Sequence, residues 1–434
     1  MWKLISIIFT GVLTSFYFFP FEFSFLPGVN VKMMLAALGL VVLGLRMAKG
    51  KNAKMDNDFF VLSLLAICVS LAGFFSITWN NTVDYAYATY IVSMWVWLSA
   101  AYVVCSLIRE VHGDISVLML ARYLAAVCLF QCVAAIVIDN YPNVKHLIDS
   151  YVSQGQDFLN QTNVKRLYGI GASLDVAGSR FSAVLVLLMY LLIHKMHEMS
   201  RMEIGFVIIE FFIIAIVGNM IARTATVGLI LAVLYLFYAL MFSTKVSSRY
   251  RRNIILGIIG SFVIIIPLSI YLYNENPFFH KQIRFAFEGF FSLVEKGEWN
   301  VASNNTLKGM IVFPDNIKTW IIGDGYFSSP RDVDPYFIGK IVGGYYMGTD
   351  VGYLRFIFYS GLIGLIAMSS FILKAGLICI RKFKEYKLLF VMLLAVNFIV
   401  WFKVSTDIFL VFALFLMISK EENEAYDNRL KLAS

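Results

Sequence analysis

The chain has 434 residues, of which 60% are hydrophobic and only 15% are charged. A soluble protein of this length needs more charge to cover its surface, so the composition excludes an ordinary soluble domain. The net charge of +8 could indicate nucleic-acid binding, but the basic residues lie in short clusters between apolar runs, which is typical of membrane topology.

A bilayer core needs about 20 apolar residues per helix. The sequence therefore predicts an all-α integral membrane protein, a single polytopic domain over residues 1–434 with about 12 transmembrane helices. Residues 4–19 could be a signal peptide, but no small-residue cleavage pattern follows them, and we interpret them as a retained helix. The predicted spans are residues 3–20, 31–48, 59–78, 86–107, 116–138, 180–198, 204–222, 224–242, 254–273, 351–373, 388–402 and 404–419.

Lysine and arginine concentrate in the connections after the second, fourth, sixth, eighth and tenth spans. By the positive-inside rule these connections are cytoplasmic, and both termini lie on the same side. Two long segments then fall at the outer face: a loop over residues 139–179 and a large loop over residues 274–350. In the large loop, phenylalanines between positions 278 and 291 form an apolar stripe, which predicts a helix lying along the membrane surface.

The outer face is where we expect function, because the cytoplasmic connections are too short to form a nucleotide-binding domain. An enzyme there needs a substrate that is already activated and delivered through the membrane, such as a lipid-linked pyrophosphate sugar. Guanidinium groups grip phosphate oxygens in a bidentate manner. Alternatively, each outer arginine only solvates its loop or contacts lipid headgroups. The candidates are Arg166, Arg180, Arg223, Arg284 and Arg331, with Arg355 just inside the tenth span.

Several short motifs resemble those of bacterial O-antigen and polysaccharide polymerases and, more distantly, O-antigen ligases. They are Arg166-Leu-Tyr-Gly169 through Gly178-Ser-Arg180, opening a helix at Phe181; Ile221-Ala-Arg223-Thr224; Ile321-Ile322-Gly323-Asp324-Gly325; Asp350-Val-Gly352-Tyr353-Leu-Arg355; and Gly361-Leu-Ile-Gly364. The family has an arginine and a glycine separated by ten residues in each large loop. Here Arg166 precedes Gly178, and Arg331 precedes Gly343, by eleven intervening residues.

The resemblance implies a glycosyltransferase of the bacterial inner membrane that moves a growing glycan from undecaprenyl pyrophosphate onto the next lipid-linked repeat unit. It implies catalytic roles for Arg166 and Arg331, no cofactor, membrane lipid around the chain, and contact with a chain-length regulator protein. No counterpart of the ligase histidine lies near Asp350, which favours a polymerase over a ligase. Two further hypotheses are a flippase or transporter for the same lipid-linked sugars and a non-enzymatic scaffold.

Asp350 lies at a loop–helix boundary, where its carboxylate could deprotonate or orient the acceptor hydroxyl. It could equally be a helix N-cap. Tyr353 and Arg355 could line the same pocket as substrate-binding residues, or Arg355 could snorkel to the interface. Asp324, between two glycines, is expected to serve the turn. Arg122 and Glu210 lie within predicted spans and are expected to snorkel or to pair with each other, and no residue cluster has the spacing of metal ligands.

Overall fold

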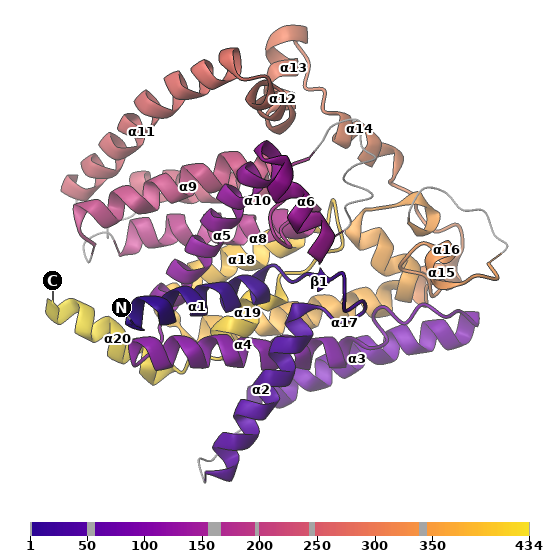
Figure 1. Ribbon diagram of the computed structural model, residues 1–434. Coiled ribbons are helices and arrows are strands. Elements are labelled where there is room, and N and C mark those ends of the chain that lie inside the picture. Colours follow the sequence, from indigo (N-terminus) through magenta and orange to yellow (C-terminus); the bar gives the residue numbers. More distant parts are fainter. Residues whose placement is uncertain are drawn as a thin grey trace. The chain divides into compact units, whose positions relative to one another are not determined.

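The computed structural model of the chain describes residues 2–49, 57–154, 166–195, 199–242, 248–337 and 345–433. These residues form helices joined by loops, with one antiparallel pair of two-residue strands (Figure 1). They divide into two compact units, which are described separately. Unit 1 comprises Met1–Leu35, Tyr102–Trp299 and Met417–Ser434, and unit 2 comprises Ala36–Ala101 and Asn300–Leu416.

Nine helices within the described ranges are long and apolar enough to cross a membrane. The protein is therefore a helical, multi-pass membrane protein, as the composition predicts. All nine coincide with predicted spans: α2 (Val31–Ala48), α3 (Asn57–Asn80), α4 (Tyr90–His112), α5 (Val117–Asn140), α8 (Leu174–His194), α9 (Arg201–Ile221), α10 (Ala225–Phe242), α11 (Ser248–Glu275) and α17 (Gly352–Lys382).

The three remaining predicted spans coincide with shorter helices. They are α1 (Trp2–Phe18), α18 (Lys387–Val400) and α19 (Phe409–Leu416). Helix α19 has only 8 residues, and at about 1.5 Å per residue it covers roughly 12 Å of a bilayer core about 30 Å thick. The total of twelve spans stays a prediction.

Helix α8 is the centre of unit 1, because it packs on α5, α9 and α10 and is buried along almost its whole length. Its backbone approaches α10 closely at Gly228, where a Cβ atom would collide with the backbone of Ser182. Helix α8 begins at Leu174, with Ser173 in extended conformation at the N-cap position and Asp175 in the first turn, where a carboxylate is favoured. The expected start at Phe181 is therefore wrong, and Gly178 and Arg180 lie inside the helix.

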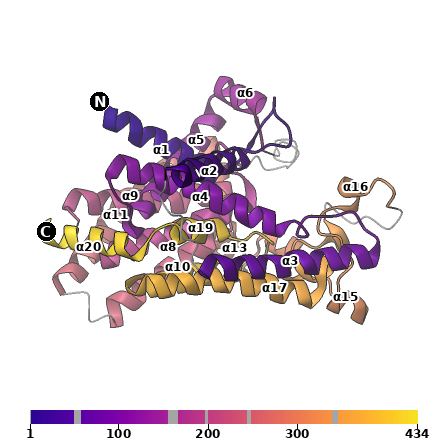
Figure 2. The same ribbon diagram turned by 90° about the horizontal axis from the view of Figure 1, so that it is seen from below.

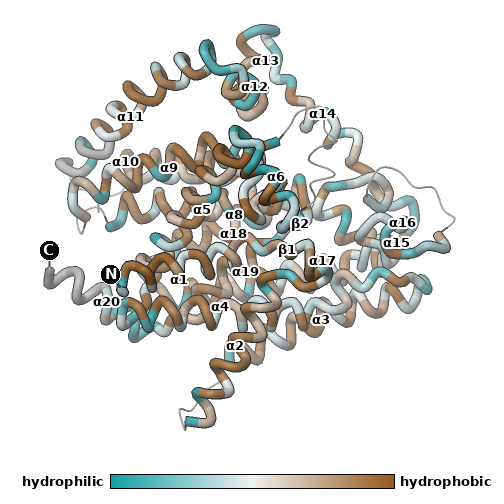
Figure 3. Tube along the Cα trace, in the orientation of Figure 1, coloured by the Kyte–Doolittle hydropathy of each residue, from teal (hydrophilic) through white to brown (hydrophobic). Residues whose placement is uncertain are grey.

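The long segments of unit 1 are partly helical. Helix α6 (Pro142–Tyr151) follows α5, and strand β2 (Val152–Ser153) pairs with β1 (Glu22–Phe23), which follows α1. After α11 come α12 (Pro277–Ala286) and α13 (Glu288–Lys296). The single surface helix expected from the apolar stripe is thus two helices, because the chain leaves helical geometry at Phe287. Figure 3 shows that the middle of α11 is largely apolar, whereas α12 and α13 have mixed polarity. Helix α20 (Lys420–Ala433) completes this unit.

Unit 2 is built on α3 and α17, which lie side by side in both views (Figures 1 and 2). They run antiparallel, because Asp58 at the start of α3 is paired with Arg381 in the last turn of α17. Helix α17 also packs on α18 and α19. The remaining elements are short: α14 (Ala302–Gly309), α15 (Ile317–Ile321), α16 (Pro330–Val333) and the 3₁₀ turns η2 (Tyr346–Gly348) and η3 (Lys384–Tyr386).

Candidate functional site

Arg223 projects from a rigid turn between α9 and α10. The hydroxyl of Thr224 donates a hydrogen bond to Asp175 of α8, and the carbonyl oxygen of Thr224 accepts one from Ser182, at 2.9 Å. The turn also lies directly against Gly178, where a Cβ atom would come within 2.8 Å of the Thr224 Cβ. Gly178 is therefore needed for close packing of α8 on the turn that carries Arg223.

The Arg223 guanidinium contacts residues of α12 and α13. It lies 4.0 Å from the centroid of the Phe285 ring, and it forms an ion pair with Glu288 at 2.6 Å. The Arg166 guanidinium lies over the same ring, 5.7 Å from its centroid. Two cations thus share one aromatic ring, an arrangement that offsets part of the cost of desolvating them.

The cluster holds two guanidinium groups, of Arg166 and Arg223, and one carboxylate, of Glu288. Burial lowers the pKa of the Arg223 guanidinium from its ordinary value, and the neighbouring charge of Arg166 acts in the same direction, whereas Glu288 opposes both. Guanidinium stays protonated at any physiological pH. An anion placed beside Arg166 and Arg223 would therefore relieve the repulsion between them.

The two other candidate arginines of unit 1 have different surroundings. Arg180 is buried within α8, with its guanidinium 5.7 Å from the centroid of the Phe19 ring. Arg284 is half exposed and forms two hydrogen bonds of 2.8 Å with the Glu295 carboxylate. The structure therefore brings together Arg166 and Arg223 around Phe285, and it engages Arg284 with a neighbouring helix.

In unit 2, the Gly323-Asp324-Gly325 segment lies over a kink in α17. Ser360 and Gly361 leave helical geometry, Gly361 with φ +65°. The Asp324 and Gly325 N–H groups donate to the carbonyl oxygens of Phe358 and Tyr359, at 2.6 and 3.1 Å. The loop thus satisfies backbone acceptors at the kink of a membrane helix, where an unsatisfied carbonyl is costly.

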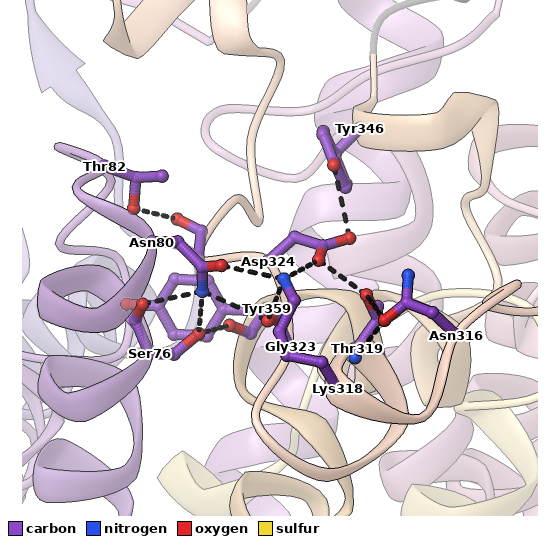
Figure 4. Close-up of polar contacts among 11 residues, drawn as sticks. Ser76, Asn80, Thr82, Asn316, Lys318, Thr319, Gly323, Asp324, Tyr346 and Tyr359 are labelled. Atoms are coloured by element: carbon purple, nitrogen blue, oxygen red, sulfur yellow. Dashed lines mark hydrogen bonds and ion pairs between the residues drawn. The ribbon is translucent and has the colours of Figure 1, made fainter.

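Asp324 also organises the side chains around this loop (Figure 4). Its carboxylate accepts hydrogen bonds from Lys318 at 2.6 Å, Thr319 at 2.7 Å and Tyr346 at 3.2 Å. The end of α3 contributes Asn80, whose side chain bonds both Lys318 and the Gly323 carbonyl oxygen. The expected role of Asp324 in the turn agrees with these contacts.

Arg355 lies beside the same loop, enclosed by aromatic rings. Its guanidinium is 3.9 Å from the centroid of the Phe327 ring and 4.3 Å from that of Tyr345. It donates hydrogen bonds to the Ser405 hydroxyl and the Phe327 carbonyl oxygen, both at 2.9 Å, and lies 3.6 Å from the Asp350 carboxylate. With a side chain only 11% exposed, Arg355 does not snorkel to an interface.

Asp350 and Tyr353 flank the start of α17. The N-cap position belongs to Val351, and no side chain caps this helix, so the expectation of Asp350 as an N-cap is wrong. The Asp350 carboxylate turns instead toward Arg355. Tyr353 donates a hydrogen bond to the Phe398 carbonyl oxygen at 2.9 Å, and its ring packs edge-on against Trp401.

Asp84 is a residue of this region that sequence reasoning missed. It lies between α3 and α4, is 2% exposed, and its carboxylate accepts the N–H groups of Phe327 and Ser328, both at 2.8 Å. Because Phe327 contacts Arg355 through both its ring and its carbonyl oxygen, Asp84 fixes the backbone on which Arg355 depends. A carboxylate in the sequence Asn-Thr-Val-Asp between two apolar runs was the only signal.

Two further sequence predictions concern charged residues elsewhere. Arg331 is exposed on α16, and Gly343, its predicted glycine partner, lies outside the described residues. Arg122 of α5 forms an ion pair with Glu203 of α9 at 3.3 Å. Of the two alternatives expected from the sequence, snorkelling or mutual pairing, the structure shows Arg122 partly exposed and bonded to Glu203 in place of Glu210.

The fold and these clusters define a class: a helical, multi-pass membrane protein with arginine–aromatic clusters in the connections between its helices. Within the described ranges, no three His, Cys, Asp or Glu side chains gather closely enough to hold a metal ion. Comparison with models of protein families, with curated proteins and with solved structures finds no match.

Proposed function

We propose that the protein is a membrane glycosyltransferase of the polysaccharide-polymerase type. It transfers a growing glycan from undecaprenyl pyrophosphate to the next lipid-linked repeat unit, at the outer face of a bacterial inner membrane. The acceptor hydroxyl oxygen attacks the anomeric carbon of the donor, and the bond from that carbon to the pyrophosphate breaks. The electron pair leaves with the pyrophosphate, and the hydroxyl proton passes to a carboxylate.

The observation that carries this proposal is the convergence of Arg166 and Arg223 on Phe285. A departing pyrophosphate gains negative charge in the transition state. Fixed guanidinium groups therefore stabilise the transition state more strongly than the ground state. Two arginines on one ring offer several N–H donors to one anion. A pyrophosphate leaving group is an anion of the size and charge that such a pair can bind.

The same contacts support the topology within this proposal. Arg166 belongs to the segment 139–179, Arg223 to the turn between α9 and α10, and Phe285 to the segment 274–350. The contacts among their side chains support placing these three connections on one side of the membrane. The basic connections lie at the opposite helix ends, which the positive-inside rule places in the cytoplasm along with both termini.

Asp350, in unit 2, is the carboxylate that the sequence suggests as a proton acceptor. Its side chain is 21% exposed and lies 3.6 Å from the Arg355 guanidinium. Arg331, for which the resemblance implies a catalytic role, is exposed on α16. Tyr353 and Arg355 shape the start of α17 through their contacts with neighbouring backbone.

The test is the length of the cell-surface polysaccharide in a host that depends on this protein. Arg166→Ala and Arg166→Lys are expected to give single repeat units in place of long chains, at unchanged amounts of protein in the membrane. Arg252→Lys, at an exposed arginine of α11, is the matched control and should leave long chains. Normal chain length in both Arg166 variants would refute the site.

The same experiment separates the related functions. A polymerase defect still displays single repeat units, because their export and attachment are intact. Loss of all surface sugar, single units included, would indicate a ligase or a flippase instead. A reporter fused near residue 160 or 310 that reads as cytoplasmic would refute the proposed orientation.

A further inference from the structure

Gln131 is a buried polar residue in the apolar helix α5, with 1% of its surface exposed. A buried amide costs free energy unless its donors and acceptor are satisfied. The partners that satisfy it therefore indicate what this residue does.

The Gln131 amide binds the backbone of Ile170 at both of its polar groups. Its Oε1 accepts the Ile170 N–H at 2.8 Å, and its Nε2 donates to the Ile170 carbonyl oxygen at 2.9 Å. The Nε2 group also donates to the Ser15 hydroxyl of α1 at 2.9 Å. The Gln131 amide thus forms with Ile170 the two hydrogen bonds that a neighbouring strand would form with an extended backbone.

The residues on either side of Ile170 are fixed as well. A Cβ atom on Gly169 would collide with the Gln131 amide oxygen, and Gly171, with φ +75°, lies directly against the Phe19 carbonyl oxygen. The Tyr168 hydroxyl donates to Asp149 of α6 at 2.7 Å and contacts Lys145. Glycine at 169 lets the backbone come within reach of Gln131.

We infer that Gln131 is a positioning residue for Arg166. By holding the backbone at 169–171, it keeps the Arg166 guanidinium over Phe285, next to Arg223. The inference rests on the proposed function for its catalytic consequence, but the positioning itself is a property of the fold.

The first measurement needs no activity. A nitroxide label is attached to the cysteine of Arg166→Cys in the full-length chain. The background carries Cys68→Ala, because Cys68 is exposed and the other four cysteines are buried. The labelled protein is reconstituted in phospholipid vesicles. Adding Gln131→Leu is expected to sharpen the electron paramagnetic resonance lines through faster label motion. Ser15→Ala removes only the bond to α1 and should leave the spectrum unchanged. Identical spectra with and without the Gln131→Leu substitution would overturn the inference.

A second variant, in the loop, tests the inference even if Gln131→Leu prevents the protein from folding. Gly169→Ala leaves α5 intact and pushes a methyl group against the Gln131 amide oxygen. It is expected to produce the same loosening at position 166. An unchanged spectrum in this variant also contradicts the inference.

The second measurement uses the rate of repeat addition in isolated membranes supplied with lipid-linked repeat units. Gln131→Leu is expected to lower the rate at least tenfold when Arg166 is present and to change nothing further in Arg166→Ala. A similar loss in both backgrounds would mean that Gln131 does not act through Arg166. If the label loosens but Arg166→Ala polymerises normally, the positioning holds and the proposed function fails. If Arg166→Ala is inactive and the label does not loosen, the proposed function holds and the positioning fails.

Discussion

Unit 1 and unit 2 each contain a cluster of arginine and aromatic side chains, but the two clusters are arranged differently. Arg223 and Arg166 contact a single ring, Phe285, on a short amphipathic helix. Arg355 lies over two rings, Phe327 and Tyr345, and donates hydrogen bonds to Ser405 and to a backbone carbonyl oxygen. The first arrangement places two guanidinium groups beside one carboxylate, that of Glu288, and in the second a single guanidinium contacts two rings and donates two hydrogen bonds within the fold.

This difference teaches how to separate a binding arginine from a structural one. The Arg355 guanidinium is held by two rings and two hydrogen bonds within the fold. Arg166 and Arg223 together carry one more positive charge than the Glu288 carboxylate neutralises, so they gain from an added anion. We therefore expect substitutions in unit 1 to affect transfer, and substitutions around Arg355 to affect stability.

The largest effect is expected at Arg223. Arg223→Ala should lower the rate of repeat addition roughly 10²–10³-fold, because it removes a donor to the departing pyrophosphate. Arg223→Lys keeps a positive partner for Glu288 but loses the planar, bidentate guanidinium, so it should recover only a small part of the rate. Rates are measured in isolated membranes at matched protein amounts. A rate for Arg223→Lys equal to that of the native protein would contradict the proposal that the Arg223 guanidinium binds the departing pyrophosphate.

The next effect concerns the stability of unit 2. Arg355→Ala should lower the free energy of unfolding by about 2–4 kcal/mol, because it leaves Asp350 without this cation and removes the packing between two rings. Arg355→Lys should restore less than half of the loss, since an ammonium cannot fill the flat space between the rings. Thermal unfolding in detergent measures both variants. A change below about 1 kcal/mol would show that Arg355 is not structural.

A smaller loss of stability is expected at Asp84. Asp84→Asn keeps the shape of the side chain but replaces an ionised acceptor of the Phe327 and Ser328 N–H groups, at a cost of about 1–2 kcal/mol. Asp332→Asn, on the exposed face of α16, is the matched control and should unfold like the native protein. Equal unfolding of the two variants would contradict the role given to Asp84.

The smallest effect is expected at Arg284. Both it and Glu295 are largely solvent-accessible, so Arg284→Ala should leave the unfolding temperature unchanged and the polysaccharide close to normal length. The measurement is the same surface-sugar profile used for Arg166. Shortening as severe as that of Arg223→Ala would extend the anion site of unit 1 along α12.

The membrane helices could be predicted because an apolar run of about 20 residues is a local property of the sequence. The start of α8 could not, because Gly178 and Arg180 look like loop residues until the packing of Gly178 on the α9–α10 turn is known. The division of the phenylalanine stripe at Phe287 was not predicted, since both helices are amphipathic and the apolar spacing continues across the break.

The candidate site was predictable only in its charged members. Arg166 and Arg223 stand out as cations near outer-facing turns, whereas Phe285 is one of several phenylalanines in its stripe. The contact of Arg223 with Phe285 joins residues about 60 positions apart, and no local pattern specifies such a pair. Gln131 and Asp84 give still weaker signals, because a single polar residue in or beside an apolar run has meaning only through its partners.

Helices α8 and α11 meet their surroundings in opposite ways. Almost all of the apolar window of α8 is buried by protein, whereas none of that of α11 is. In a membrane, the exposed apolar surface of α11 would face lipid, and a thicker or thinner bilayer would change its tilt more than that of α8, whose neighbours hold it. Since α11 continues directly into α12, the acyl-chain length of the host membrane would set how firmly Phe285 meets its two arginines.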